Sequence, residues 1–122
     1  MADEITYRNT LSVRKGTLVQ AVDSGQSLAT MTGTTSIGGV QTVGTSDEAL
    51  TIGSDVATLG FAWFRNTDVT NYVEIGVKPA GTFYPLIKLK AGESAGFRFG
   101  SNAPYVQANA APVNLHYVLY AD

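Results

Sequence analysis

The stretch LGFAWFRNTDVTNYVEIGV, from Leu59 to Val77, contains the pattern that decides the fold class. On both sides of the polar segment NTDVTN, at residues 66–71, side chains alternate between two faces, with apolar residues at every second position. Alternation with a period of two is typical of β-strands, and Asn and Asp favour the turn between two strands. This stretch therefore predicts two strands joined by a short connection.

The same alternation continues along the chain, notably over residues 15–22, 82–90, 94–99 and 113–120. Gly, Pro and Asn interrupt it about every ten residues, and no segment has a sustained helical period of 3.6 residues. This pattern predicts an all-β chain of about eight or nine strands, folded as an antiparallel sandwich or barrel. Pro85 cannot donate to a strand ladder, so its strand is expected at a sheet edge or with a bulge.

The first fifteen residues differ from the rest because polar and basic groups interrupt their apolar positions. We interpret residues 1–15 as an extended N-terminal arm or an added edge strand, and residues 16–122 as a single β-sandwich domain. Within that domain, Asp23-Ser24-Gly25 is expected to turn the chain. Trp63 alternates with Leu59 and Phe61 and is expected in the core.

Composition narrows the range of functions. Only 15% of the 122 residues are charged, against roughly 25% in an average globular protein. A surface of Thr, Ser, Asn, Gln and Gly suits a protein that is packed against neighbours. The net charge of −2 argues against direct nucleic-acid binding. The absence of cysteine excludes disulfides and zinc–thiolate sites.

Neither a secretory signal nor a membrane-spanning helix is expected from the sequence. The opening residues MADEITYRNT lack the apolar core of a secretory signal, which predicts synthesis in a cytoplasm. No apolar run approaches the roughly 20 residues that a membrane-spanning helix needs, so no membrane partner is expected.

One motif is typical of hydrolases. Gly92-Glu93-Ser94-Ala95-Gly96 matches the G-x-S-x-G nucleophile elbow, in which a strand, a sharp turn and a helix expose the serine. The residues that follow, FRFGSNAP, alternate as a strand instead of forming a helix. His116 is the only histidine. It alternates with Leu115 and Tyr117, which places it on the polar face and favours a surface role. We therefore expect a structural turn at Ser94 and no enzymatic activity.

The segment NTDVTN offers oxygen donors that a calcium ion accepts. Its carboxylates lack the number and spacing of an EF-hand loop, and a turn stabilised by Asx hydrogen bonds explains Asn66 and Asp68 more simply. The sequence therefore predicts no metal site and no cofactor.

The predicted functional residues are protein-contact residues. Tyrosine is enriched at interfaces, and basic residues on a tethered arm are well placed to reach a neighbour. The predicted set is Tyr7, Arg8, Arg14, Lys15, Tyr72, Tyr84, His116 and Tyr120.

Three segments together resemble small phage virion proteins of the capsid decoration, or cement, type. They are GFAWFRNTDVTNYVEIGV, GTFYPLIKLKAGESAGFRF and APVNLHYVLYAD, within residues 59–122. The resemblance implies a jelly-roll-like β-sandwich on the capsid surface of the virion, which binds the major capsid protein and stabilises the assembled head. It also implies self-association as a homo-trimer or dimer.

Two alternatives stay open at this point. The same fold serves tail and head-fibre components of virions, because a fold does not fix a function. A carbohydrate-binding module is the alternative from another class, and it would need an aromatic side chain on an exposed face for sugar stacking.

Overall fold

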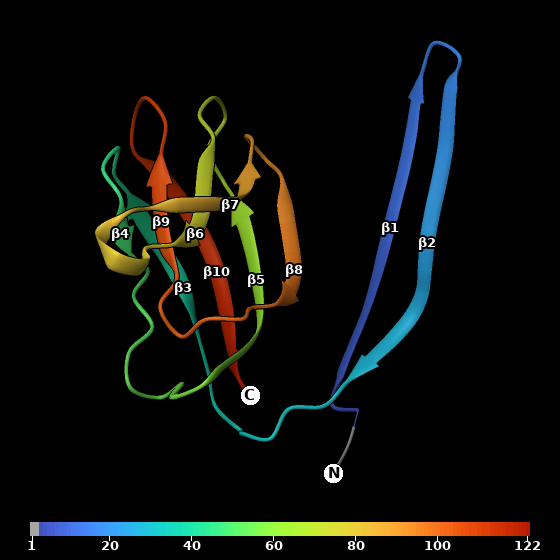
Figure 1. Ribbon diagram of the computed structural model, residues 1–122. Coiled ribbons are helices and arrows are strands. Elements are labelled where there is room, and N and C mark those ends of the chain that lie inside the picture. Colours follow the sequence, from blue (N-terminus) through green and yellow to red (C-terminus); the bar gives the residue numbers. More distant parts are fainter. Residues whose placement is uncertain (1–2) are drawn as a thin grey trace. The chain divides into compact units, whose positions relative to one another are not determined.

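The computed structural model describes residues 3–122, which form β-strands joined by turns and loops (Figure 1). The strands make one two-stranded hairpin and two four-stranded antiparallel sheets. The helical part of the described residues is a single 3-10 turn at Pro79–Gly81. The chain divides into two compact units, of which the first ends at Thr32 and the second runs from Gly33 to Asp122. The expected all-β antiparallel fold is confirmed.

The first unit is a long β-hairpin of β1 (Ile5–Lys15) and β2 (Leu18–Ala29). The ladder runs from Ile5 opposite Ala29 to Lys15 opposite Leu18, and Gly16 at the tip has a φ of +58°. The sequence suggested a single arm that ends at residue 15. In the structure residues 18–29 pair with that arm instead of joining a sandwich sheet, so the boundary between the units falls after Thr32.

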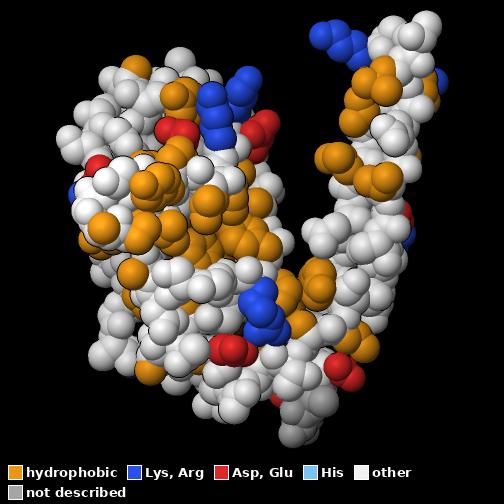
Figure 2. Space-filling view, in the orientation of Figure 1, with side chains coloured by type: hydrophobic (Ala, Val, Ile, Leu, Met, Phe, Trp, Pro, Cys, Tyr) orange, Lys and Arg blue, Asp and Glu red, His pale blue; other side chains and the backbone are white. Residues whose placement is uncertain are grey.

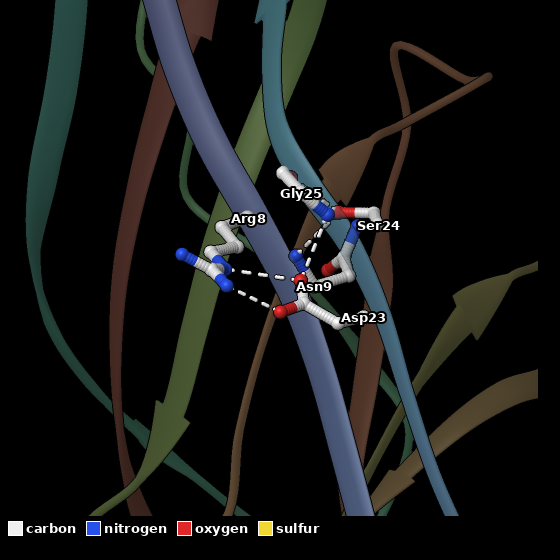
Figure 3. A network of polar contacts seen from close by, with 5 residues as sticks. All are labelled: Arg8, Asn9, Asp23, Ser24 and Gly25. Atoms are coloured by element: carbon white, nitrogen blue, oxygen red, sulfur yellow. Dashed lines mark hydrogen bonds and ion pairs between the residues drawn. The ribbon is translucent and has the colours of Figure 1, made fainter.

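The segment Asp23-Ser24-Gly25, expected to turn the chain, instead forms a β-bulge inside β2 (Figure 3). The backbone N–H of Gly25 donates to Asp23 Oδ1 at 2.8 Å, and the N–H of Asn9 donates to Ser24 Oγ at 3.0 Å. Side chains thus bind backbone groups that the shifted ladder leaves unpaired, and Gly25 tolerates a φ of +69°. The strand therefore continues through a sequence that is typical of turns.

The second unit contains eight strands in two sheets. They are β3 (Ser36–Val43), β4 (Glu48–Ala49), β5 (Leu59–Asn66), β6 (Val73–Val77), β7 (Tyr84–Leu89), β8 (Ser94–Arg98), β9 (Tyr105–Ala108) and β10 (Val113–Ala121). The first sheet has the order β3-β10-β5-β8 and the second β4-β9-β6-β7. Most neighbours within a sheet are distant in sequence, so the chain passes repeatedly from one sheet to the other.

One apolar core contains residues of both sheets of the second unit. Phe64 is fully buried, with its ring centroid 5.8 Å from that of Phe97 and 6.4 Å from that of Phe99. Along β10, the side chains at positions 113, 115, 117 and 119 are all buried, which agrees with the alternation of faces expected over residues 113–120. The second unit is therefore a β-sandwich-like pair of sheets around a closed core.

Leu59 is buried as expected, but from Phe61 onward the two faces of β5 are reversed relative to the sequence-based expectation. Ala62 and Phe64 are buried, whereas Phe61 and Trp63 are half-buried on the outer face. The core position expected for Trp63 was wrong. Both faces of this strand are apolar, so alternation alone does not say which one points inward. Asn66 resolves this, because its buried amide donates to backbone carbonyls near β6 and β7 and thereby turns the even-numbered positions inward.

The expectation for Pro85 is confirmed in both of its forms. Strand β7 lies at the edge of its sheet, and the β6–β7 register shifts between Ile75 and Gly76, where Pro85 pairs with Gly76. The backbone approaches so closely here that a Cβ on Gly76 would lie 1.9 Å from the Tyr84 carbonyl oxygen. A missing proline N–H is tolerated at an edge, and only glycine fits opposite it.

Candidate functional site

The hairpin presents one apolar face, which we call the ribbon face. It consists of Leu11 and Val13 from β1 and of Leu18 and Val22 from β2, which the ladder brings to the same side. All four side chains are exposed, including Leu11 at 64% and Val22 at 55%. The opposite side carries mainly polar groups. An isolated two-stranded hairpin is only marginally stable in water, so this face is suited to contact with another surface.

Four of the predicted contact residues lie on the hairpin. Tyr7 and Lys15 share the side of the ribbon face, while Arg8 and Arg14 lie on the opposite side. The Arg8 guanidinium donates to both carboxylate oxygens of Asp23 beside the bulge, with a distance of 3.0 Å from Nε to Oδ1 (Figure 3). This ion pair is exposed, and it lowers the pKa of Asp23 and raises the pKa of Arg8. Arg8 therefore has a partner within the hairpin.

A second candidate surface covers the outer side of the sheet β3-β10-β5-β8. We call it the aromatic face, and its members are Val40, Phe61, Trp63, His116, Val118 and Tyr120. The rings of Trp63 and His116 meet edge to face with their centroids 5.1 Å apart. The Arg98 guanidinium carbon lies 5.3 Å from the centroid of the Phe61 ring.

Glycine shapes the surroundings of Trp63 on this face. Trp63 pairs with Gly96 on one side, where a Cβ would be 3.4 Å from Cδ1 of the indole. On the other side it pairs with Val118, whose next neighbour is Gly38. Strand β8 therefore contributes no side chain directly beside the indole, and the neighbour from β10 is the smaller side chain of Val118.

The second sheet carries a tyrosine surface with lysines over it. Lys88 Nζ lies 4.0 Å from the ring centroid of Tyr72, and Lys78 Nζ lies 5.6 Å from that of Tyr105. The cation–π contact holds the Lys88 ammonium against its ring, whereas the Lys78 ammonium is held by an ion pair with Asp47. Tyr84 is exposed at the edge strand β7. Figure 2 shows hydrophobic side chains gathered on one face of this unit and others following the hairpin.

The predicted contact residues thus fall into three groups instead of one. Tyr72 and Tyr84 belong to the second sheet, and His116 and Tyr120 belong to the aromatic face. The prediction did not include Phe61 and Trp63, although both lie on the aromatic face and the Trp63 ring meets that of His116. The signal that could have found them is the run LGFAWF in residues 59–64, which is apolar on both faces of one strand.

The hydrolase-like motif has the geometry of a turn followed by a strand. Gly92 has a φ of +80°, and Ser94 begins β8, which pairs with β5. Ser94 is opposite Arg65, and Arg65 is opposite His116, so two strand spacings, or about 10 Å, separate the serine from the histidine. The strand occupies the place of the helix that a nucleophile elbow needs.

The segment NTDVTN is held by Asx hydrogen bonds, as expected. The Asn66 Oδ1 accepts the Asp68 N–H at 2.8 Å, and Asp68 Oδ2 accepts the N–H groups of Asn71 and Thr70 at 2.6 and 3.0 Å. These backbone donors, Asn71 first, lower the pKa of Asp68. The oxygen donors of this loop are therefore engaged in shaping the turn.

Comparison of the chain with known protein families, with curated proteins and with solved structures found no match. Within residues 3–122, no helix has the length and apolar character needed to cross a bilayer. In the same range, no three His, Asp or Glu side chains gather in a way that could hold a metal ion. The clues to function are therefore the fold and the three surfaces described above.

Proposed function

We propose that this chain is a structural virion protein, a capsid decoration (cement) protein that binds the assembled phage head and stabilises it. In this proposal its partner is the major capsid protein, its place is the capsid surface, and it performs no catalysis. The observation that carries the proposal is the order of the strands in the two sheets.

That order supports a jelly roll. In a jelly roll, eight strands form two four-stranded antiparallel sheets through two Greek keys, an architecture found in viral capsid proteins and in lectins. Here the orders β3-β10-β5-β8 and β4-β9-β6-β7 place the first strand beside the last and the second beside the next to last. Such nesting is what two wound Greek keys produce. The resemblance of residues 59–122 to decoration proteins favours the virion member of this fold class over the others.

The surfaces supply the means of attachment. A ligand that binds the assembled lattice but not its free subunits stabilises the lattice by mass action. The aromatic face offers large, rigid side chains of the kind enriched in interface centres. Two arginines, Arg65 and Arg98, lie on the same side of the sheet, so the contact combines these rings with positive charge. We therefore place the capsid contact on the aromatic face.

The test uses purified tailless heads assembled without this chain. The protein is expected to sediment with heads and to raise the temperature at which they release DNA. Val40→Asp, at a 62% exposed position on the aromatic face, is expected to weaken sedimentation with heads at least about tenfold, because an ionised carboxylate would be desolvated at the contact. Val69→Asp, at a 90% exposed loop position, is the matched control and is expected to bind like the original chain.

Two results would count against the head assignment. If the chain stays in the supernatant with heads and instead purifies with tails or fibres, the tail or head-fibre alternative replaces it. If it binds heads without changing their heat stability, attachment remains and the cement role is lost.

A second candidate function is carbohydrate binding, and the outer position of Trp63 favours it. A sugar-stacking indole must lie on an exposed face, and Trp63 is half-buried on the outer face opposite Gly96 of β8, which places no side chain beside it. A glycan array would test this with Trp63→Ala, and with Tyr72→Ala as the control from the other sheet. Loss of a signal in the Trp63 variant alone would support a lectin-like role, and the absence of any signal from the original chain would exclude it.

A further inference from the structure

The ribbon face raises a question that the proposed virion role does not answer, namely what covers it. The hairpin strands have 11 and 12 residues, and no described residue of the first unit is buried. A hairpin of about 36 Å by the usual strand rise of 3.3 Å is unusually long for two strands with no second layer in their own unit. Its amphipathic pattern therefore calls for a partner layer over the ribbon face.

The chemistry of the ribbon face restricts that layer. Its side chains are mainly aliphatic, with the pair Leu11–Val22 beside the pair of Val13 with the uncharged Gln20. Between the bulge and the tip, Lys15 is its one charged residue. The best cover for a pleated aliphatic surface is another pleated aliphatic surface at the sheet-packing distance of about 10 Å. It should also be about as long as the hairpin. The ribbon face of a second copy has each of these properties.

We propose that the hairpin is a self-association element, in which the ribbon faces of two copies of this chain pack against each other. Such a contact is isologous. If a residue of the first copy contacts a given residue of the second, the same two positions are also in contact with the copies exchanged. The inference concerns only copies of this chain, and it stands or falls independently of binding to a phage head.

The charges of the hairpin select the orientation of the pair. Lys15 lies at the tip on the side of the ribbon face, while Asp3 and Glu4 lie at the opposite, open end, and all three are exposed. In a parallel pair, Lys15 would lie against Lys15. In an antiparallel pair with full overlap, each Lys15 lies near Asp3 and Glu4 of the other copy. Opposite charges then meet at both ends, which favours the antiparallel pair.

The size of the contact predicts a weak pair. A hairpin about 36 Å long and about 10 Å wide covers roughly 400 Å² per copy, from the strand rise and the strand spacing. This is about half of a standard protein interface, so dissociation in the micromolar range or weaker is expected. Copies fixed side by side on a lattice would associate more strongly, because each meets the other at a high effective concentration.

The first test is sedimentation of the full-length chain from about 1 μM to about 1 mM, around the weak affinity that the area predicts. The double variant Leu11→Thr/Val22→Thr keeps good strand formers but places hydroxyls in the contact, and it is expected to raise the dissociation constant at least about tenfold. Val19→Thr is the matched control, since Val19 is 63% exposed on the opposite side of the same strand. It is expected to leave the constant unchanged.

The second test resolves orientation and tolerates weak association. The chain has no cysteine, so single cysteines can be linked by a bis-maleimide of about 10 Å reach, the spacing of packed sheets. Leu11 lies one residue from the midpoint of β1, so in the antiparallel pair Leu11→Cys is expected to link to its counterpart. The two copies of Lys15→Cys would be about 30 Å apart along the strands and are expected not to link.

Each outcome decides the proposal. A concentration-dependent dimer that the double variant weakens and the control does not, with linking only at position 11, supports it. A monomer at all concentrations overturns it, as does association that both variants weaken equally or neither weakens. Linking at position 15, or a three-copy assembly, overturns the antiparallel pair. Circular dichroism of each variant verifies that its strand content is retained.

Discussion

The hairpin and the sandwich are built from equally regular strands, yet only one of them has a core. In the described part of the first unit no residue is buried, whereas the second unit buries Asn66 and the entire apolar cluster between its sheets. Both units alternate side chains between two faces. The difference shows that alternation defines faces, while burial requires a second layer that the hairpin lacks within its own unit.

The largest expected effect compares equal truncations in the two units. Phe64→Ala removes a fully buried ring that contacts Phe97 and Phe99, and it should lower the free energy of unfolding by about 3–5 kcal/mol. Leu11→Ala in the hairpin should change the same transition by less than about 0.5 kcal/mol. Urea denaturation followed by fluorescence is suitable, because the single tryptophan, Trp63, lies in the sandwich. Equal losses for both variants would contradict the separation of the units.

A second comparison concerns two glycines. A Cβ on Gly76 would lie 1.9 Å from the Tyr84 carbonyl oxygen, so Gly76→Ala must separate β6 from β7 and should cost about 3 kcal/mol. Gly16 at the hairpin tip has open space around it and only its φ of +58° to maintain. Gly16→Ala should therefore cost about 1 kcal/mol, confined to the hairpin. Hydrogen exchange of peptides from each unit measures both effects, and loss of protection in the sandwich of the Gly16 variant would refute the assignment.

Much of the fold could be predicted because some residues act locally. Pro85 marks an edge strand and a bulge since it lacks an N–H, and the strict alternation of β10 marks one inner face. The turn at NTDVTN follows from Asx chemistry within the loop itself. In each case the sequence signal and the physical cause lie in the same few residues.

The errors have a different origin, which is competition between segments. Asp23-Ser24-Gly25 has the composition of a turn, but the long partner strand β1 draws it into a ladder as a bulge. On β5 both faces are apolar, and buried hydrogen bonds from Asn66 decide which one points inward. The aromatic face was missed for that reason, since Phe61 and Trp63 were expected to be buried. Neither outcome depends on local sequence alone.

A third prediction compares polar side chains in the two units. Asn66 is buried, and its amide donates to the carbonyls of Asn71 and Leu89 at 2.8 and 2.9 Å. Asn66→Ala leaves these groups without that donor and should cost about 2 kcal/mol in the urea experiment. Ser24→Ala, which removes exposed hydrogen bonds at the bulge, should leave the sandwich transition unchanged. If Asn66→Ala lowers the free energy of unfolding by less than about 0.5 kcal/mol, as ordinary surface substitutions do, the amide is dispensable.

The smallest expected effect is the response of each unit to acid. The pKa of Asp23 in the hairpin is lowered by Arg8 first and then by the Gly25 N–H, and the pKa of Asp68 in the sandwich by the N–H groups of Asn71 and Thr70. A carboxyl whose pKa is lower in the folded state stabilises that state above its unfolded pKa, and this contribution is lost as the pH falls through the folded value. Both groups are exposed, so each contribution is small and local.

Acidification below about pH 4, the ordinary range of an aspartate pKa, should therefore lower the local stability of both segments. Protonation of Asp23 acts on the hairpin, and protonation of Asp68 acts on the loop at residues 66–71. Asp68→Asn should flatten the acid dependence of the loop at residues 66–71 while leaving that of the hairpin unchanged, and Asp23→Asn should do the reverse. Carbon-detected titration of the two carboxyls measures the pKa values directly, and hydrogen exchange at several pH values measures the local stabilities. Midpoints at or above the ordinary aspartate value would mean that these hydrogen bonds do not form in solution. A variant that alters both segments together would mean that the two units do not respond to acid separately.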